Sequence, residues 1–202
     1  MPAPKPTRRI EFKCLTENDV IPLVALHQNS RVASLIADGL IDSPDMAARY
    51  VAAMGAVYIE RPGLGVWMSE DRESGTRLGL FGLMPIDGGT DVEIGARLLE
   101  SGWGRDYAVE GCAALVAHAF SVVNLDLLWA TCLPEHRSAQ FVLARLGFDF
   151  HGQRLAYGSK LVAFTKRRNP DEIEVVLRPR RDALNLVKTW QETFSLATSQ
   201  PI

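Results

Sequence analysis

Hydrophobic and polar residues alternate with a period of two in several short stretches of the chain. In the clearest one, residues 91–99 read DVEIGARLL, with an apolar residue at every second position up to residue 96. Such alternation is typical of a β-strand with two unlike faces. Leu98 and Leu99 break the alternation, which predicts a bulge or a splay of this strand. By the same reasoning we expect strands near residues 10–14, 65–69, 78–84, 92–99, 126–132, 148–154 and 161–166.

Other stretches place apolar residues at the three- and four-residue spacing of a helix. Ser43 and Pro44 mark the start of one helix, because serine caps free amides and proline suits the first turn. Pro22 lies inside another helix, expected to end near residue 28, so this helix starts late or is kinked. The helices are expected near residues 16–28, 43–57, 106–120, 138–146 and 182–196.

Strands interleaved with helices predict a mixed α/β fold, in which helices pack across a twisted sheet. Residues 10–166 carry this pattern and form one predicted domain, preceded by a proline-rich arm, residues 1–9, expected to be disordered. Residues 167–202 form a C-terminal extension with a possible strand at 173–177 and an amphipathic helix. The apolar stripe of that helix must be buried, either on its own domain or on a second copy in a homodimer. The stripe consists of Leu184, Val187, Trp190 and Phe194.

Composition narrows the class of protein only a little. The 202 residues are 47% hydrophobic and 23% charged, close to the averages of globular proteins. The formal net charge of −2 gives no argument for a nucleic-acid partner. No apolar run approaches the ~18 residues that a membrane span needs, so we expect a cytoplasmic protein. Cys14, Cys112 and Cys132 lack metal-binding or disulfide spacing, and no metal site is expected.

The strand at residues 92–99 runs through a glycine-containing turn directly into a helix. Gly102 and Gly104 permit a tight turn and the close approach of a ligand to the main chain. The first turn of a helix has free backbone amides and the positive end of the helix dipole, which together bind phosphate groups. The segment therefore predicts an anionic ligand, although an ordinary strand–turn–helix connection has the same local pattern.

A second segment has a related organisation. Residues 127–133, LLWATCL, form a short apolar run that suits a buried strand. Pro134 ends this strand, and a helix follows up to Leu146. Gly147 then suits the left-handed position just after a helix.

These two segments together resemble the GNAT superfamily of N-acetyltransferases, and most of all its ribosomal-protein alanine N-acetyltransferase branch. That branch has a strand with Glu-Ile-Gly, then Trp-Gly-Lys-Gly-Tyr-Ala-x-Glu-Ala, where this chain has EIG at 93–95 and WGRDYAVEG at 103–111. The later family signature is Pro-x-Asn-x-x-Ser followed by Leu-Gly-Phe. This chain has PEHRS at 134–138 and LGF at 146–148. The resemblance covers roughly residues 10–165.

The resemblance implies a GNAT fold, a mixed twisted sheet with a splayed fourth strand, and acetyl-coenzyme A as cofactor. Backbone groups of Arg97, Leu98 and Leu99 would pair with the pantetheine arm. The diphosphate would bind the turn after the strand, and Arg105 and Arg137 would contact phosphates or remain solvated. The amides implied for the diphosphate are those of Trp103, Gly104, Arg105, Asp106, Tyr107 and Ala108.

Three residues depart from the family pattern. Asp106 stands where the family has a second glycine, and its carboxylate would either cap the helix or repel the diphosphate. Ser101 replaces a glutamine or arginine, and His136 replaces an asparagine beside the pantetheine. These departures leave open an alternative function, a catalytically weak coenzyme A-binding module that acts through protein partners.

Acetyl transfer to an amine requires a base for the amine and a proton for the departing thiolate. Glu93 is the candidate base, with an outward-facing strand carboxylate as the alternative. By resemblance Ser138 would protonate the thiolate, although the local sequence favours a helix N-cap, and the two roles can coexist. His136 is a third candidate, because the imidazole pKa lies in the working range. The acceptor would be a protein N-terminus or a small primary amine, bound between residues 29–43 and the loop after residue 150.

Overall fold

The computed structural model describes residues 3–171 and 174–198 of the chain. Seven strands form one sheet in the order β1-β2-β3-β4-β5-β7-β6. The strands are β1 (Ile10–Cys14), β2 (Gly65–Asp71), β3 (Arg77–Pro85), β4 (Val92–Leu98), β5 (Leu127–Cys132), β6 (Asp149–Ala156) and β7 (Ser159–Arg167). The helices are α1 (Val20–Gln28), α2 (Ser30–Ala33), α3 (Pro44–Glu60), α4 (Tyr107–Ser121), α5 (Arg137–Arg145) and α6 (Arg180–Thr198).

Strand β4 is splayed away from β5. These neighbours form the parallel pair of the sheet, and they share a single residue pair, Glu93 with Trp129. On its other side, β4 pairs with β3 along its whole length without a register shift. The break in alternation at Leu98 therefore marks a splay and not a bulge. Because the two strands separate beyond Glu93, the gap between them is bordered by unpaired backbone of β4 and β5.

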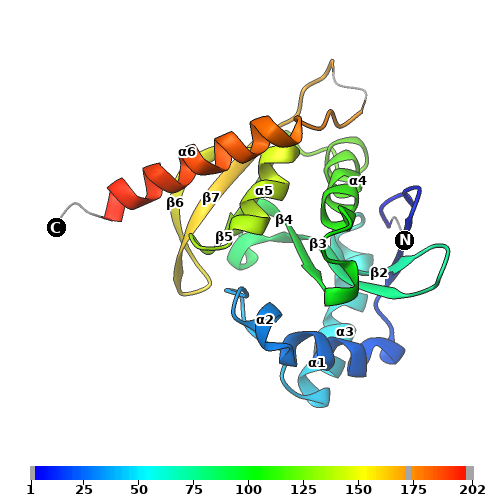
Figure 1. Cartoon of the computed structure of the whole chain (residues 1–202). Helices are drawn as coiled ribbons and strands as arrows, with labels where there is room; N and C mark the ends of the chain where they lie inside the picture. The colour runs from blue at the N-terminus through cyan, green and yellow to red at the C-terminus, as the bar shows by residue number, and fades with distance from the viewer. Residues whose placement is uncertain (1–2, 172–173, 199–202) are drawn as a thin grey trace.

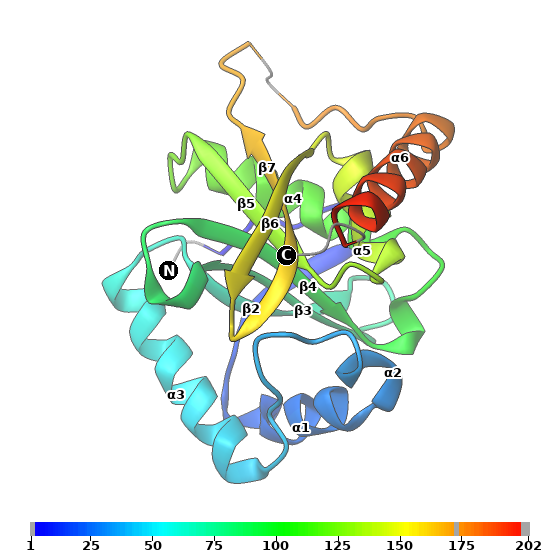
Figure 2. The same cartoon turned by 90° about the vertical axis from the view of Figure 1, so that its left-hand side faces the viewer.

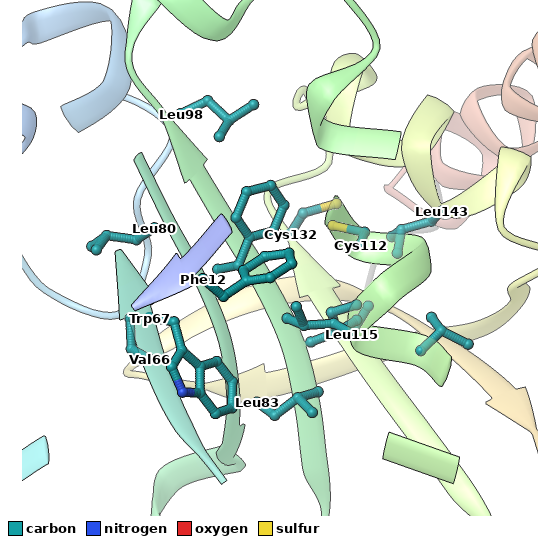
Figure 3. Close-up of a cluster of buried hydrophobic side chains, with 14 of the residues drawn as sticks. Phe12, Val66, Trp67, Leu80, Leu83, Leu98, Cys112, Leu115, Cys132 and Leu143 are labelled. Carbon is teal, nitrogen blue, oxygen red and sulfur yellow. The ribbon is translucent and has the colours of Figure 1, made fainter. Parts of the chain in front are cut away.

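Helices lie on both sides of this sheet. In Figure 1, α1, α2 and α3 lie below the strands, and α4, α5 and α6 lie above them. Helix α4 packs against β3 and β4 at Gly111, where an added Cβ atom would meet the ring of Phe81 at 2.3 Å. Figure 3 shows this core, with Leu115 and Cys112 on α4 facing the side chains of the strands. None of the helices in the described part of the chain is both long and apolar enough to cross a membrane.

The helix starts follow the local chemistry of the sequence. Ser43 precedes α3 with its hydroxyl 3.4 Å from the amide of Met46, and Pro44 occupies the first turn. Pro22 lies in the first turn of α1, which is preceded by a separate 3-10 helix, Glu17–Asp19. The later start is the outcome that proline favours, since its missing N–H is harmless there.

Residues 3–9 of the N-terminal arm lie against α4, and residues 1–2 lie outside the described residues. The backbone amide and guanidinium of Arg9 both donate to Glu110 of α4, at 3.0 and 2.6 Å. The Thr7 hydroxyl donates to the same carboxylate. These bonds lower the pKa of Glu110 even though burial opposes them. Composition did not reveal the arm's partner because that partner lies about a hundred residues away.

The C-terminal extension packs on its own domain. Trp190 and Phe194 of α6 contact the rings of Phe164 and Phe150, with centroids 4.7 and 5.0 Å apart. Figure 2 shows α6 lying beside α5, at the edge of the sheet that ends with β6. The apolar face of α6 is therefore buried on its own domain, while dimerisation through the extension stays a prediction.

Two expectations for the extension are wrong in detail. Leu184 is 52% exposed, and the buried position in the first turns of α6 is Ala183 instead. The helix is rotated so that its buried positions are Ala183, Val187, Trp190 and Phe194. Residues 174–177 form no strand; Ile173 of the expected strand lies outside the described residues.

Candidate active site

Glu93 lies where β4 and β5 separate. Both of its carboxylate oxygens accept hydrogen bonds: the Thr131 hydroxyl of β5 donates to one at 2.8 Å, and the Tyr157 hydroxyl donates to the other. The side chain is thus held by donors from β5 and from the turn between β6 and β7. It does not point freely into solvent, which removes the outward-facing alternative.

The surroundings of Glu93 favour its protonated form more than water does. Burial raises the pKa of the Glu93 carboxyl, and the hydrogen bonds from Tyr157 and Thr131 partly offset this rise. Asp38 adds a smaller like-charge contribution in the raising direction. A carboxylate with a raised pKa is a stronger base, so it accepts a proton more readily near neutral pH.

Tyr157 is a site residue that sequence reasoning missed. It occupies the turn of the β6–β7 hairpin in a left-handed conformation, with φ of 53°, followed by Gly158 at 72°. Its backbone amide donates to the carboxylate of Asp87, at 3.2 and 3.1 Å to the two oxygens. Gly158 suits the second position of a two-residue hairpin turn, but nothing local indicates that the side chain of Tyr157 reaches Glu93.

The side chain of Arg97 makes contacts that the resemblance did not imply. It forms an ion pair with Asp38, in the segment between α2 and α3, and its Nη1 lies 3.4 Å from His27 Nε2. Burial and then the Arg97 charge lower the pKa of His27 to about 4, so this imidazole is neutral at physiological pH. Arg97 therefore ties the open side of β4 to the segment between α2 and α3.

The backbone groups of β4 that face the gap between β4 and β5 belong to residues other than those expected. The Leu99 amide donates to the Leu78 carbonyl of β3 at 2.9 Å. Because hydrogen-bonded pairs alternate along an antiparallel ladder, Arg97 also turns its backbone groups toward β3. The groups directed away from β3 belong to Ala96 and Leu98. This corrects the expectation for Arg97 and Leu99, which assigned consecutive residues to the same edge.

Trp103 supports the turn after β4. Its indole Nε1 donates to the Leu98 carbonyl at 2.9 Å, and its backbone amide donates to Glu100 at 3.0 Å. The guanidinium of Arg31 lies 4.5 Å from the centre of its ring. Since its amide is already used, Trp103 is a packing residue and does not offer the amide that the resemblance implied.

The turn between Trp103 and α4 presents a row of free backbone amides. Within the described ranges, 3–171 and 174–198, the amides of residues 104–109 have no acceptor, and the first bond of α4 is from Glu110 to Asp106. Gly104 has a φ of 72° with no atom within 4 Å of a built Cβ, so the turn is open on this side. Consecutive amides at a helix start form a concave anion site, and this donor set fits a diphosphate.

Asp106 does not cap α4. It lies at the N-cap position in a left-handed conformation, with φ of 59°, and its side chain accepts no bond from the helix amides. Both carboxylate oxygens instead accept from Nη1 of Arg180, the first residue of α6, at 2.9 and 2.8 Å. The left-handed backbone turns the carboxylate away from its own helix.

The candidates at the start of α5 lie beyond the end of β5. Ser138 is exposed and is the second residue of α5, so it is not the N-cap. That position belongs to His136, and burial lowers the pKa of its imidazole. Arg137 and Arg105 are both exposed, and the carbonyl of Arg105 accepts from the guanidinium of Arg9 at 3.0 Å.

The buried cysteines are not nucleophiles. Burial raises the pKa of both Cys112 and Cys132 to about 12. Their thiols therefore stay protonated at neutral pH, and thiols are poor nucleophiles compared with thiolates. This agrees with direct transfer to an amine without an acyl-enzyme intermediate.

Comparison with known proteins identifies the family. Residues 9–149 match the family model described as acetyltransferase (GNAT) domain. The protein YkkB of Bacillus subtilis (strain 168) is 24% identical over 165 residues, which cover 81% of this chain and 94% of YkkB. Among solved structures, an acetyltransferase from Agrobacterium tumefaciens has a TM-score of 0.71 and 22% identity, covering 83% of this chain and 96% of its own.

A second solved structure that is similar to this chain is a complex with coenzyme A. RimL, a ribosomal L7/L12 alpha-N-protein acetyltransferase in complex with coenzyme A, has a TM-score of 0.66 and 15% identity. The match covers 83% of this chain and 99% of that one. At this identity the likeness shows the fold, whereas the family match extends over most of the chain. The protein is therefore a member of the GNAT acetyltransferase family, an N-acetyltransferase that uses acetyl-CoA.

Proposed function

We propose that this enzyme acetylates a primary amine by direct attack on acetyl-CoA, with Glu93 as the general base. The observation that carries this proposal is the position of Glu93 at the splay, held by Tyr157 and Thr131 with a raised pKa. When bound, acetyl-CoA supplies an electrophilic acetyl carbon and a thiolate leaving group. The carboxylate takes a proton from the attacking amine, directly or through water.

Two segments of the backbone would bind the cofactor in this proposal, the turn before α4 and the end of β4. The free amides of residues 104–109 would hold the diphosphate, since they are unpaired and gathered at a helix start. The backbone groups of Ala96 and the amide of Leu98, directed away from β3, would pair with the amide groups of the pantetheine arm, while the Leu98 carbonyl accepts from Trp103. Both assignments use main-chain groups, so neither requires a cationic side chain in this segment.

The departing thiolate lies near the start of α5 in this proposal. The positive end of a helix dipole stabilises a nearby anion, and Ser138 carries a hydroxyl in the first turn of α5. His136 has a lowered pKa and is neutral at physiological pH, so it would act as an N–H donor and not as a cation. We assign Ser138 as the proton donor and His136 as its neighbour in the same turn.

The acceptor is best identified with a panel of primary amines. Release of free coenzyme A thiol should require both acetyl-CoA and an amine from the panel, which should include peptide N-termini, amino acids and polyamines. Hydrolysis of acetyl-CoA without dependence on any amine would contradict the proposed reaction. A preference for peptides with a free N-terminus over their N-methylated forms would place the enzyme with protein acetyltransferases.

Acetyl-CoA is expected to raise the melting temperature of the protein. A ligand that binds only the native state at about 100 times its dissociation constant stabilises by roughly 2.7 kcal/mol. For a chain of this size, that corresponds to a shift of roughly 5–10 °C. Differential scanning fluorimetry measures it, with adenosine as a control that lacks the diphosphate. An unchanged melting temperature at millimolar acetyl-CoA would contradict the diphosphate site assigned to the amides of residues 104–109.

Replacing Tyr157 with Phe should shift the acid limb of the pH profile to higher pH. The Tyr157 hydroxyl stabilises the ionised carboxylate, so its loss raises the pKa of Glu93 further. The rate should fall most at low pH and recover as pH increases. A pH series of kcat/KM measures this, with Tyr50→Phe as the matched tyrosine control. An equal loss at all pH values would mean that Tyr157 has only a structural role.

A further inference from the structure

The ion pair between Asp106 and Arg180 joins the region that matches the family model to the C-terminal extension. Asp106 lies within the cofactor turn, inside the region that matches the family model, residues 9–149. Arg180 begins α6, in the extension beyond that region. The extension therefore reaches back to the turn where the diphosphate is proposed to bind. The contact uses both carboxylate oxygens, at 2.9 and 2.8 Å.

Several contacts fix the start of α6 in this place. The Arg178 amide donates to the Arg145 carbonyl at 2.7 Å, and its guanidinium donates to the Ala144 carbonyl at 2.8 Å. The guanidinium of Arg180 lies 5.3 Å from the ring centre of Phe141 on α5. Arg180 thus spans from α5 to the N-cap of α4. A positively charged group is held beside the row of free amides.

Stability alone does not explain the pair. The side chains of Arg180 and Asp106 are 61% and 51% exposed, and exposed ion pairs add little to folding free energy. The backbone does not require a carboxylate either. A φ of 59° suits glycine or asparagine at least as well as aspartate. A negative charge beside a diphosphate site is unfavourable for binding unless a cation balances it.

We infer that Arg180, supplied by the C-terminal extension, neutralises the carboxylate of Asp106 and so makes the turn acceptable to the diphosphate. The inference rests on the cofactor site proposed above. Asp106 and Arg180 act as one electroneutral unit in it. Either residue can be changed together with its partner, but the loss of Arg180 alone leaves an unbalanced carboxylate in the cradle.

A double-mutant cycle on the full chain tests this unit. The dissociation constant of coenzyme A is measured by titration calorimetry for the parent, Arg180→Gln, Asp106→Asn and the double variant. Arg180→Gln should weaken binding about fivefold or more at low salt, and Asp106→Asn should restore the affinity in the Arg180→Gln background. Arg181→Gln is the matched control, because this neighbouring arginine is exposed and makes no bond to Asp106. Melting temperatures without ligand show whether each variant folds.

The possible results separate the two levels of the proposal. Failure of the parent protein to bind coenzyme A would overturn the cofactor cradle and this inference with it. Normal binding by the parent with no loss in Arg180→Gln would overturn only the inference. An equal loss in the Asp106→Asn background would show a direct contact without neutralisation, which also overturns it. With 3′-dephospho-coenzyme A the loss should persist, since the diphosphate remains; a loss confined to coenzyme A would point to the 3′-phosphate and contradict the assignment.

Discussion

Replacing Glu93 with Gln should lower kcat by about 10²- to 10⁴-fold while the protein stays folded. Gln keeps the shape of the side chain and still accepts a hydrogen bond through its amide oxygen. It cannot accept the proton of the attacking amine. The loss should be largest where the amine is mostly protonated, because deprotonation is then the demanding part of the reaction.

The free energy of unfolding of the Glu93→Gln variant should stay the same or rise, although its kcat falls. Burial raises the pKa of Glu93 in the folded state above its ordinary value of 4.5. The folded state therefore prefers the protonated carboxyl, and this contribution is present below pH 4.5 and lost as pH rises through the folded pKa. At neutral pH the ionised Glu93 opposes folding. The Glu93→Gln variant should thus unfold at an equal or higher denaturant concentration than the parent at pH 7.

Two measurements check this prediction. Thiol release with a saturating amine gives kcat, and urea unfolding at pH 4 and pH 7 gives the free energy of unfolding. Glu11→Gln is the control, because Glu11 lies on the edge strand β1 and forms a long ion pair with Arg72 at 3.7 Å. Unchanged turnover in Glu93→Gln would remove Glu93 as the base while leaving the family assignment intact.

Among methyl groups added to the sheet one at a time, the one in Gly79→Ala should lower the stability of the protein most. Gly79 has a φ of 131°, which L-residues rarely adopt. A Cβ atom there would lie 2.1 Å from the Arg97 carbonyl oxygen and 2.8 Å from the Leu98 Cα. Both are backbone atoms of β4 and cannot rotate away. We expect a loss of about 3 kcal/mol or more in the free energy of unfolding.

The position of Gly79 links this loss to the cofactor site. Gly79 pairs with Leu98, the last residue of β4 before the turn. Displacing β4 would therefore also move the edge that faces the splay. Gly95→Ala is the matched control, because Gly95 lies on the same strand pair with no atom within 4 Å of a built Cβ. Thermal unfolding should show a drop of roughly 6–12 °C for Gly79→Ala and little change for Gly95→Ala. Similar melting temperatures for the two variants would contradict the steric argument.

Local patterns predicted the elements well because each has a local physical cause. Strand β1 runs from Ile10 to Cys14 as the alternation indicated, and α3 begins at Pro44 behind its serine cap. The splay of β4 was expected from the adjacent leucines and is present, with one residue pair to β5. The family motifs in the chain led to the GNAT fold and to acetyl-CoA, which the family match supports.

Predictions that failed depended on contacts between distant residues. The arm before β1 is bonded to Glu110 of α4, and α6 packs on Phe164 and Phe150, so that Ala183 is buried and Leu184 is not. Periodicity defines a stripe on a helix, but the partner surface decides which edge of that stripe is covered. The resemblance implies that the Trp103 amide binds a ligand. In the structure this amide donates to the Glu100 carbonyl, and that bond depends on the geometry of the turn, which the sequence does not reveal.

The order of strands and helices along the chain, the glycine turn before α4 and the carboxylate at Glu93 can all be read from the sequence, since periodicity, capping and residue type are properties of neighbours along the chain. Tertiary structure alone decided what surrounds that carboxylate and that turn. Tyr157 reaches Glu93 across 64 positions, and Arg180 reaches Asp106 across 74. Such pairs depend on how the strands are arranged in the sheet and on where α6 packs, and no local pattern predicts them. For this reason the sequence indicates Glu93 as a candidate base by residue type, while the hydrogen bonds that surround it are seen only in the fold.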